Sequence, residues 1–203
     1  GTYPMKKLIA LVLAAMLCMT ACIALAADLK IGAVMLGDET EGYTLAHMEG
    51  IKQAAAELGL SDSIVWKYKV PEDQTCYDSA LDLVGQGCNL IISNSYGHQT
   101  YMMQAAAEYP DVIFSHATGY MSNPNNYNNY FGRIYQARYL AGVAAGLKSL
   151  ETNNNNVGYV PAYGTEYAET CSGINGFALG VQAVNPDATV YVKELGNWFD
   201  EVN

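Results

Sequence analysis

Rings and hydrogen-bonding side chains gather at the positions where the predicted strands end. The rings are Tyr43, Tyr96, Tyr120, Tyr163, Tyr167 and Trp198, and the polar groups are Asp38, Asn94, Ser95, His98, His116, Asn197 and Asp200. Any one of them has an ordinary structural explanation, as when Asp200 caps the helix expected after it. Flat apolar walls with a few polar groups are, however, what a pocket for a small organic molecule requires. Their accumulation therefore predicts a ligand-binding cleft.

The elements that must position these side chains alternate between strands and helices. Strands are predicted over 30–36, 64–68, 89–93, 112–115, 157–160 and 189–195, and helices over 43–58, 73–85, 100–108, 134–150 and 167–184. The Asn- and Tyr-rich segment 123–130 is predicted to be a loop. The alternation is typical of right-handed βαβ units with parallel sheets. In such α/β folds, ligands bind beyond the carboxyl ends of the strands.

The alternation restarts after the Asn-rich segment 152–156, which indicates a second domain. We expect a first α/β domain over 28–132, a hinge and crossover helix over 133–155, and the start of a second domain over 156–203. Two strands and one helix cannot cover both faces of a parallel sheet. The second domain is therefore expected to be incomplete, with exposed apolar surface around residues 157–195.

The first 27 residues have the pattern of an export signal. Lys6 and Lys7 precede a charge-free apolar run over 8–27, as in a secretory leader. The segment 24–26 (ALA) fits signal peptidase, whereas 19–22 (MTAC) fits lipid attachment at Cys22, so both processing routes stay open. An uncleaved transmembrane helix is the alternative. The protein is expected in the periplasm or on the outer face of the cell membrane.

Composition and motifs exclude several functions. A formal net charge of −10 has the wrong sign for binding a nucleic-acid backbone. No nucleophile elbow, P-loop or dinucleotide-binding glycine motif follows a predicted strand, so we expect neither an enzyme nor a cofactor. Cys76 and Cys88 bracket a helix and lie about 18 Å apart at ~1.5 Å per residue, beyond the reach of a disulfide. With Cys171, they are expected to be free thiols.

Two charged or metal-binding alternatives are weaker. His47, His98 and His116 fall near predicted strand ends, but none lies in a zinc-site spacing. A metal site built on them remains an alternative. Near the first strand, Asp38 with its acidic neighbours at 39 and 41 would repel a phosphate. Arg133 and Arg138 are the counter-argument, although Arg138 is expected to bridge to carboxylates of the other domain.

Several long stretches resemble the basic-membrane-protein family of ABC-transporter solute-binding lipoproteins, which includes purine nucleoside receptors. They are KIGAVMLGDETEGYTLAHMEG (30–50), DLVGQGCNLIISNSYG (82–97), YPDVIFSHATGY (109–120), YFGRIYQARYLAGVAAGL (130–147), INGFALGVQAVNPDA (174–188) and GNWFD (196–200). The resemblance implies a type I periplasmic-binding-protein fold, with two Rossmann-like lobes joined by a hinge. Family members are considerably longer, which agrees with an incomplete second lobe.

The resemblance also implies roles for particular residues. Tyr43 and Trp198 would stack on the two faces of a purine base. The base edge or a ribose would be bound by Asp38, Asn94 and His47. Further ligand-binding candidates are Thr44, Ser95, Tyr96, Tyr163, Asn175 and Asp200. The family often carries an acid after the fourth strand to read the base edge, but residues 117–119 contain no carboxylate.

Together these observations predict an exported receptor of an ABC importer that binds a purine nucleoside or purine base between two lobes. The closed form would deliver the ligand to a membrane permease, and modification of Cys22 would anchor the receptor. The alternatives are a receptor for another small neutral solute, such as a sugar or a signalling molecule, and the histidine-based metal-binding protein.

Overall fold

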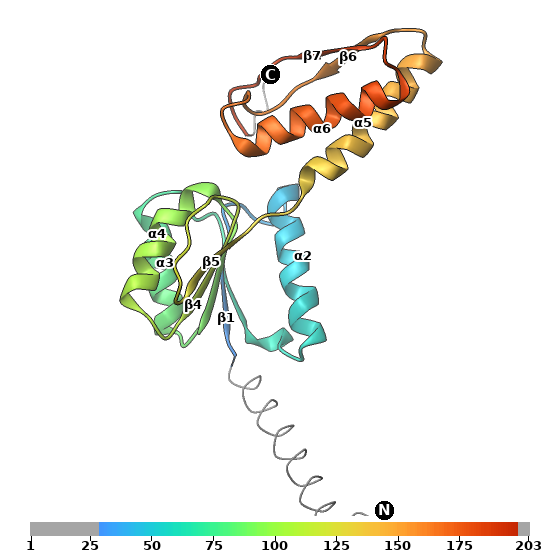
Figure 1. Ribbon diagram of the computed structural model, residues 1–203. Helices are drawn as coiled ribbons and strands as arrows, with labels where there is room; N and C mark the ends of the chain where they lie inside the picture. The colour runs from blue at the N-terminus through green and yellow to red at the C-terminus, as the bar shows by residue number, and fades with distance from the viewer. Residues whose placement is uncertain (1–28, 199–203) are drawn as a thin grey trace, which may run out of the picture. The chain divides into compact units, whose positions relative to one another are not determined.

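Two separately packed units make up the chain in the computed structural model, which describes residues 29–198 (Figure 1). The division falls after Phe131. Unit 1 is therefore described over 29–131 and unit 2 over 132–198. The predicted leader with Cys22, and the predicted site residue Asp200, lie outside the described residues.

Unit 1 is built on a parallel sheet, which confirms the predicted α/β class. Over residues 29–131 the sheet has five strands in the order β2-β1-β3-β4-β5. Their bounds are β1 (Ile31–Val34), β2 (Ile64–Lys67), β3 (Leu90–Ser93), β4 (Ile113–Ala117) and β5 (Tyr127–Tyr130). Because all strands run the same way, their carboxyl ends meet at one edge of the sheet.

Helices cover both faces of this sheet. Helix α2 (Gly42–Glu57) lies on one face, and α3 (Gln74–Gly85) and α4 (Gln99–Glu108) lie on the other (Figure 1). Short 3-10 helices, η1 (Ser61–Ser63) and η2 (Tyr96–His98), complete the unit. Along the first strand, Ala33 and Met35 pack in one cluster with Met48 of α2. Val34 packs in another with Leu83 of α3. This period of two is that of a strand buried on both faces.

The prediction of a loop over 123–130 is wrong for its second half, where Tyr127–Tyr130 forms the edge strand β5. Asparagine is uncommon in strands, but here two asparagines hold the strand from outside it. Oδ1 of Asn123 accepts hydrogen bonds from the backbone N–H groups of Asn126 and Tyr127. Nδ2 of Asn126 donates to three backbone carbonyls at the end of α4 and the start of β4. The fully buried ring of Tyr127 then anchors the strand.

Unit 2 contains two helices and a small sheet within its described residues. Its elements are α5 (Ile134–Glu151), β6 (Asn156–Tyr159), α6 (Ala168–Val184) and β7 (Thr189–Val192), with β6 and β7 parallel. The two helices lie side by side (Figure 1). A Cβ atom added at Gly142 would overlap the backbone oxygen of Phe177, so glycine is required for this close approach.

The apolar surface expected around residues 157–195 is exposed. Val160, Leu179, Tyr191 and Val192 all present their side chains to solvent, whereas the small core gathers Val157, Phe177, Val181 and Ala188. Helix α5, which the sequence assigned to the hinge segment, packs within unit 2 against α6. Between residues 29 and 198, no helix has both the length and the apolar character needed to cross a membrane.

The predicted free thiols are confirmed. Cys76, Cys88 and Cys171 are all unpaired, and the first two are buried. Burial raises the pKa of the Cys76 thiol to about 12. A thiol that stays protonated is a poor nucleophile, so Cys76 is a packing residue.

Candidate functional site

The turn between β1 and α2 places the first candidate ring. Glu41 caps the helix, because its carboxylate accepts hydrogen bonds from the backbone N–H of Tyr43 at 2.7 Å and of Thr44 at 2.8 Å. A cap of this kind satisfies N–H groups that have no partner inside the helix. It fixes Tyr43 in the first turn of α2, directly beyond the carboxyl end of β1.

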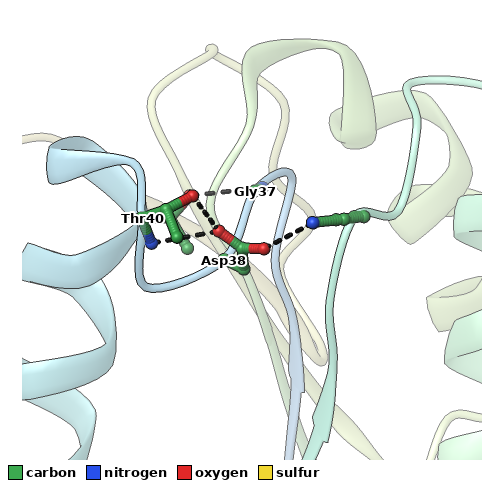
Figure 2. A network of polar contacts seen from close by, with 5 residues as sticks. Gly37, Asp38 and Thr40 are labelled. Atoms are coloured by element: carbon green, nitrogen blue, oxygen red, sulfur yellow. Dashed lines mark hydrogen bonds and ion pairs between the residues drawn. The ribbon is translucent and has the colours of Figure 1, made fainter.

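Asp38 braces the same turn. Its carboxylate accepts from the backbone N–H of Thr40 at 3.0 Å and from the Thr40 hydroxyl at 2.5 Å, and it forms an ion pair with Lys69 at 2.6 Å (Figure 2). Hydrogen bonds from Lys69 and Thr40 hold the pKa of Asp38 well below its usual range. One carboxylate oxygen is therefore engaged within the turn, and the other ties the turn to Lys69, which follows β2.

Asn94 holds the segment that carries Tyr43. Its side chain has no exposed surface, and Oδ1 accepts from the backbone N–H of Leu36 at 2.8 Å. Its Nδ2 donates to the hydroxyl of Thr44, which is also fully buried and accepts from the N–H of Gly37. The phenol of Tyr43 donates to the backbone oxygen of Asn94 at 2.5 Å. Asn94 and Thr44 thus form a frame, while Tyr43 as a residue remains 40% exposed.

Tyr43 belongs to a small aromatic group that we call the Tyr43 cluster: Tyr43, His47 and Tyr130. The imidazole of His47 contacts the Tyr43 ring edge-on, with centroids 4.6 Å apart, and lies 6.4 Å from the ring of Tyr130. Burial lowers the pKa of His47, although the carboxylate of Glu41 opposes the shift. A neutral imidazole offers one hydrogen-bond donor and one acceptor.

The residues after β3 hold a second ring at the same edge. Ser95 is buried and donates to the carboxylate of Glu72, which also accepts from the backbone N–H of Gly97 at 2.8 Å. These bonds shape the segment that carries Tyr96. The Tyr96 ring is nearly half exposed and lies 6.3 Å from that of Tyr120, which follows β4.

The turn after β4 has an unusual backbone. Thr118 has φ +64° and Gly119 has φ +63°. A β-branched residue in the left-handed region is rare and strained. Gly119 is required, because a Cβ there would lie 2.5 Å from Nε2 of His116. The Thr118 hydroxyl is buried and has no hydrogen-bond partner.

The three histidines do not form a metal site. His98 and His116 are fully buried in unit 1, whereas His47 is half-buried on α2. Among the described residues, no group of three or more His, Cys, Asp or Glu side chains is placed to hold a metal ion. Burial lowers the pKa of His116 to about 4, so this ring is a neutral core residue.

Unit 2 carries a cavity of about 250 Å³ at the carboxyl end of β6. It is lined by residues of α5, β6, α6 and the segment after β7: Ile134, Arg138, Tyr159, Val160, Pro161, Ala162, Glu169, Thr170, Gly173 and Trp198. The Trp198 ring is 57% exposed and meets Tyr163 in a T-shaped contact with centroids 5.4 Å apart. The cavity thus combines a large aromatic ring with charged and hydroxyl groups.

The charged groups of this cavity come from the two helices. Burial raises the pKa of the Glu169 carboxyl, and the positive charge of Arg138 opposes that shift. The bridge from Arg138 to carboxylates of the other domain stays a prediction; within its own unit, the Arg138 charge acts on Glu169. Asn175 is exposed on α6, outside the residues that line the cavity, and its amide donates to the sulfur of Cys171 at 3.5 Å.

The predicted site residues thus fall into groups. Unit 1 links Asp38, Tyr43, Thr44, His47 and Asn94 around the end of β1, with Ser95 and Tyr96 next along the edge. Unit 2 brings Tyr163 and Trp198 together and leaves Asn175 apart. Two residues of these groups were not predicted from the sequence. Tyr130 was assigned to a loop, and the place of Glu169 near Arg138 depends on how α6 packs beside α5.

A model of one protein family, described as ABC transporter substrate-binding protein PnrA-like (Bmp), matches residues 36–203. A Haloferax volcanii protein named as an ABC transporter glucose-binding protein is 44% identical over 160 residues, which are 78% of this chain and 39% of that protein. A purine-binding protein of Brucella abortus is 34% identical over 173 residues, 85% of this chain and 48% of that protein. The chain therefore spans less than half the length of these relatives.

Solved structures agree in fold. An ABC transporter solute-binding protein from Conexibacter woesei matches 85% of this chain and 56% of its own, with a TM-score of 0.66 and 21% identity. A transcriptional activator of the comK gene from Bacillus halodurans matches 84% and 55%, with a TM-score of 0.68 and 23% identity. These likenesses show the periplasmic-binding-protein type of α/β fold. With the family match over residues 36–203, they lead to one conclusion: the chain belongs to the PnrA-like (Bmp) family of ABC transporter substrate-binding proteins.

Proposed function

We propose that this substrate-binding protein is an exported receptor whose ligand is a purine nucleoside or a purine base. The observation that carries the proposal is the Tyr43 ring, held half-exposed at the carboxyl edge of the sheet by Glu41 and Asn94. A rigid, accessible ring at this edge is suited to stacking against a flat heterocycle. Stacking of one base on one aromatic side chain is worth about 1–3 kcal/mol.

The polar groups beside the ring favour an uncharged ligand. Glu39 and Glu41 flank the turn, and Asp38 stays ionised because Lys69 and Thr40 engage it. This negative charge opposes the approach of a phosphate. His47 stays neutral near pH 7 and offers a donor and an acceptor, as the edge of a base does. The Brucella relative that is named purine-binding supports the same ligand class.

Trp198 supplies the corresponding ring in unit 2, where Tyr163 supports it edge-on. The sandwich of one ligand between Tyr43 and Trp198 is a prediction from the family resemblance, and it needs a direct test. Residues predicted to contact the ligand but buried here, Asn94 and Thr44, act in this proposal by positioning Tyr43.

A sugar is the second candidate ligand. It is favoured by the Haloferax relative that is named glucose-binding, and by the Arg138 and Glu169 side chains in the cavity beside Trp198. Aromatic faces with charged hydrogen-bonding groups also suit a polyol. Adenosine, adenine and glucose therefore belong in the same titration series.

The test is isothermal titration of these three compounds into the full chain and into Tyr43→Ala and Trp198→Ala variants. We expect the purines to bind the unaltered protein, and each variant to lose about 5- to 150-fold in affinity, from ~1–3 kcal/mol per stacked ring. Tyr191→Ala removes an exposed ring from β7 and is the matched control. Binding of glucose alone would move the assignment to the sugar class. Unchanged purine affinity in Trp198→Ala would remove Trp198 from the site.

We also propose that the receptor serves a membrane permease and is anchored through Cys22. The support is the sequence 19–22 (MTAC) at the end of the apolar leader. Mass spectrometry of the membrane fraction should find a lipid-modified N-terminal cysteine. A soluble product that begins after Ala26 would instead establish cleavage by signal peptidase.

A further inference from the structure

The cavity in unit 2 holds two opposite charges that do not neutralise each other in a direct ion pair. Arg138 reaches it from α5 and Glu169 from the first turn of α6. The ion pairs found within residues 29–198 involve other side chains: Lys67 with Asp82, Lys69 with Asp38, and Lys148 with Glu151. Arg138 and Glu169 nevertheless lie near enough to interact electrostatically. Both therefore keep hydrogen-bonding capacity toward the cavity.

Gly173 provides room between the groups that line this cavity. A Cβ at this position would lie 3.3 Å from the Tyr159 hydroxyl and 3.8 Å from Cγ of Arg138. Glycine is among the least favourable residues inside a helix, and Gly173 lies inside α6 with no left-handed backbone to require it. A side chain here would narrow the cavity beside the Tyr159 hydroxyl and Arg138, so the glycine keeps that space open.

From this arrangement we infer that Arg138 and Glu169 together bind one neutral edge of the ligand, an edge that carries a hydrogen-bond acceptor next to a donor. A guanidinium only donates and a carboxylate only accepts, so the pair is complementary to such an edge. A phosphate would meet Glu169 and an ammonium would meet Arg138, and each would be repelled. Trp198 supplies the apolar wall beside the edge. The inference rests on the proposed function and names the part of the ligand that unit 2 binds.

Two kinds of ligand group have this chemistry: the vicinal diol of a sugar or ribose, and the N1/6-substituent edge of a purine base, which is a lactam in an oxopurine and an amidine in adenine. Four probes separate them. Glucose carries only the diol, hypoxanthine carries only the base edge, and adenosine and inosine carry both. Isothermal titration of all four into the full chain, Arg138→Gln, Glu169→Gln and Glu151→Gln identifies the edge. Glu151 pairs with Lys148 on the surface of α5 and provides the matched control.

Loss of a hydrogen bond to a charged group is expected to weaken binding by about ten- to a hundredfold. If the pair binds the diol, Arg138→Gln and Glu169→Gln should lose this much affinity for adenosine, glucose and inosine but none for hypoxanthine. If the base edge is bound, they lose it for hypoxanthine, inosine and adenosine but not for glucose. Glu151→Gln should stay within twofold throughout. Either pattern supports the inference.

Gly173→Ala keeps both charges and narrows the space beside them. It therefore tests the inference even if a charge variant fails to fold. We expect at least fivefold weaker binding, whereas Gly50→Ala, whose Cβ meets nothing within 4 Å, should bind normally. If every probe that binds the unaltered protein also binds Arg138→Gln, Glu169→Gln and Gly173→Ala with unchanged affinity, this inference is overturned and the proposed function stands. If the unaltered protein binds neither these four compounds nor adenine, the proposed function itself fails, and this inference fails with it.

Discussion

The phenolic oxygen of Tyr43 lies 2.5 Å from the backbone carbonyl oxygen of Asn94, to which it donates a hydrogen bond. This bond ties the first turn of α2 to the residue that follows β3. The backbone N–H of Tyr43 is bound in turn by Glu41. Because both ends of the residue are held, little side-chain entropy would remain to be lost if the proposed ligand stacks on the ring.

The first prediction separates the ring of Tyr43 from its hydroxyl. Tyr43→Phe keeps the ring but removes the donor to Asn94, so the free energy of unfolding should fall by about 1 kcal/mol. Ligand affinity should fall much less than in Tyr43→Ala, because the stacking surface is retained. Urea denaturation and isothermal titration measure the two effects. Equal losses of affinity in Tyr43→Phe and Tyr43→Ala would show that the hydroxyl, not the ring, contacts the ligand.

The second prediction concerns acid stability. The pKa of His116 is lowered by burial to about 4 in the folded protein, against about 6.5 for an unperturbed histidine. Between these values the unfolded chain binds more protons than the folded one, so stability falls as the pH drops from 6.5 to 4. At about 1.4 kcal/mol per pKa unit, His116 accounts for a loss of about 3 kcal/mol.

Urea denaturation of unit 1 between pH 7 and pH 4 checks this window. The lowered pKa of His98 acts in the same direction, so the slope should shrink in His116→Gln without disappearing. A slope identical to that of the unaltered protein would show that His116 is not buried as a neutral ring. Above pH 7 neither histidine should affect stability, because both are neutral in the folded and the unfolded state.

The third prediction tests the close approach of α5 and α6. Gly142→Ala would place a methyl group against the backbone oxygen of Phe177, and we expect a destabilisation of about 1–3 kcal/mol from overpacking. Gly50→Ala is the control, since it adds the same methyl group to α2 without a neighbour within 4 Å. It should stabilise the protein by up to about 1 kcal/mol through helix propensity. A gain of stability in Gly142→Ala would mean that the helices are farther apart than described.

The fourth prediction concerns the strained turn after β4. Thr118→Gly should raise the free energy of unfolding by about 1 kcal/mol, because glycine adopts the left-handed region without the cost that a β-branched residue incurs. It also removes a buried hydroxyl that lacks a partner. Thr118→Ala keeps the left-handed backbone and a Cβ, so it should gain less. Thermal unfolding ranks the three proteins, and a lower midpoint for Thr118→Gly would show that the side chain stabilises the turn.

Most of the fold was predictable because its apolar patterns are regular. The run around Ala33 and Val34 is apolar on both faces of the strand, as a central parallel strand requires. The edge strand β5 was not predicted, because it is held by hydrogen bonds of Asn123 and Asn126 to backbone groups. Such bonds leave no periodic signal.

The site was predictable only in part, for a similar reason. Strand ends indicated Tyr43 and Trp198, since topology alone brings such residues to one edge of a sheet. A polar side chain at a strand end can point toward a ligand or be bound to other groups of the protein. Which of the two holds depends on hydrogen bonds that the sequence does not reveal. Asn94 and Ser95 are buried among protein partners, and Glu169 meets Arg138 only because two glycine-rich helices pack closely.

The frame beneath position 43 has a consequence for substitutions there. Asn94 and Thr44 bind each other and the backbone of residues 36 and 37, and Glu41 binds backbone N–H groups. None of these bonds uses the side chain at 43, whose hydroxyl makes a separate bond to the backbone of Asn94. We therefore expect that a single substitution can exchange the ring at position 43 while the scaffold stays folded.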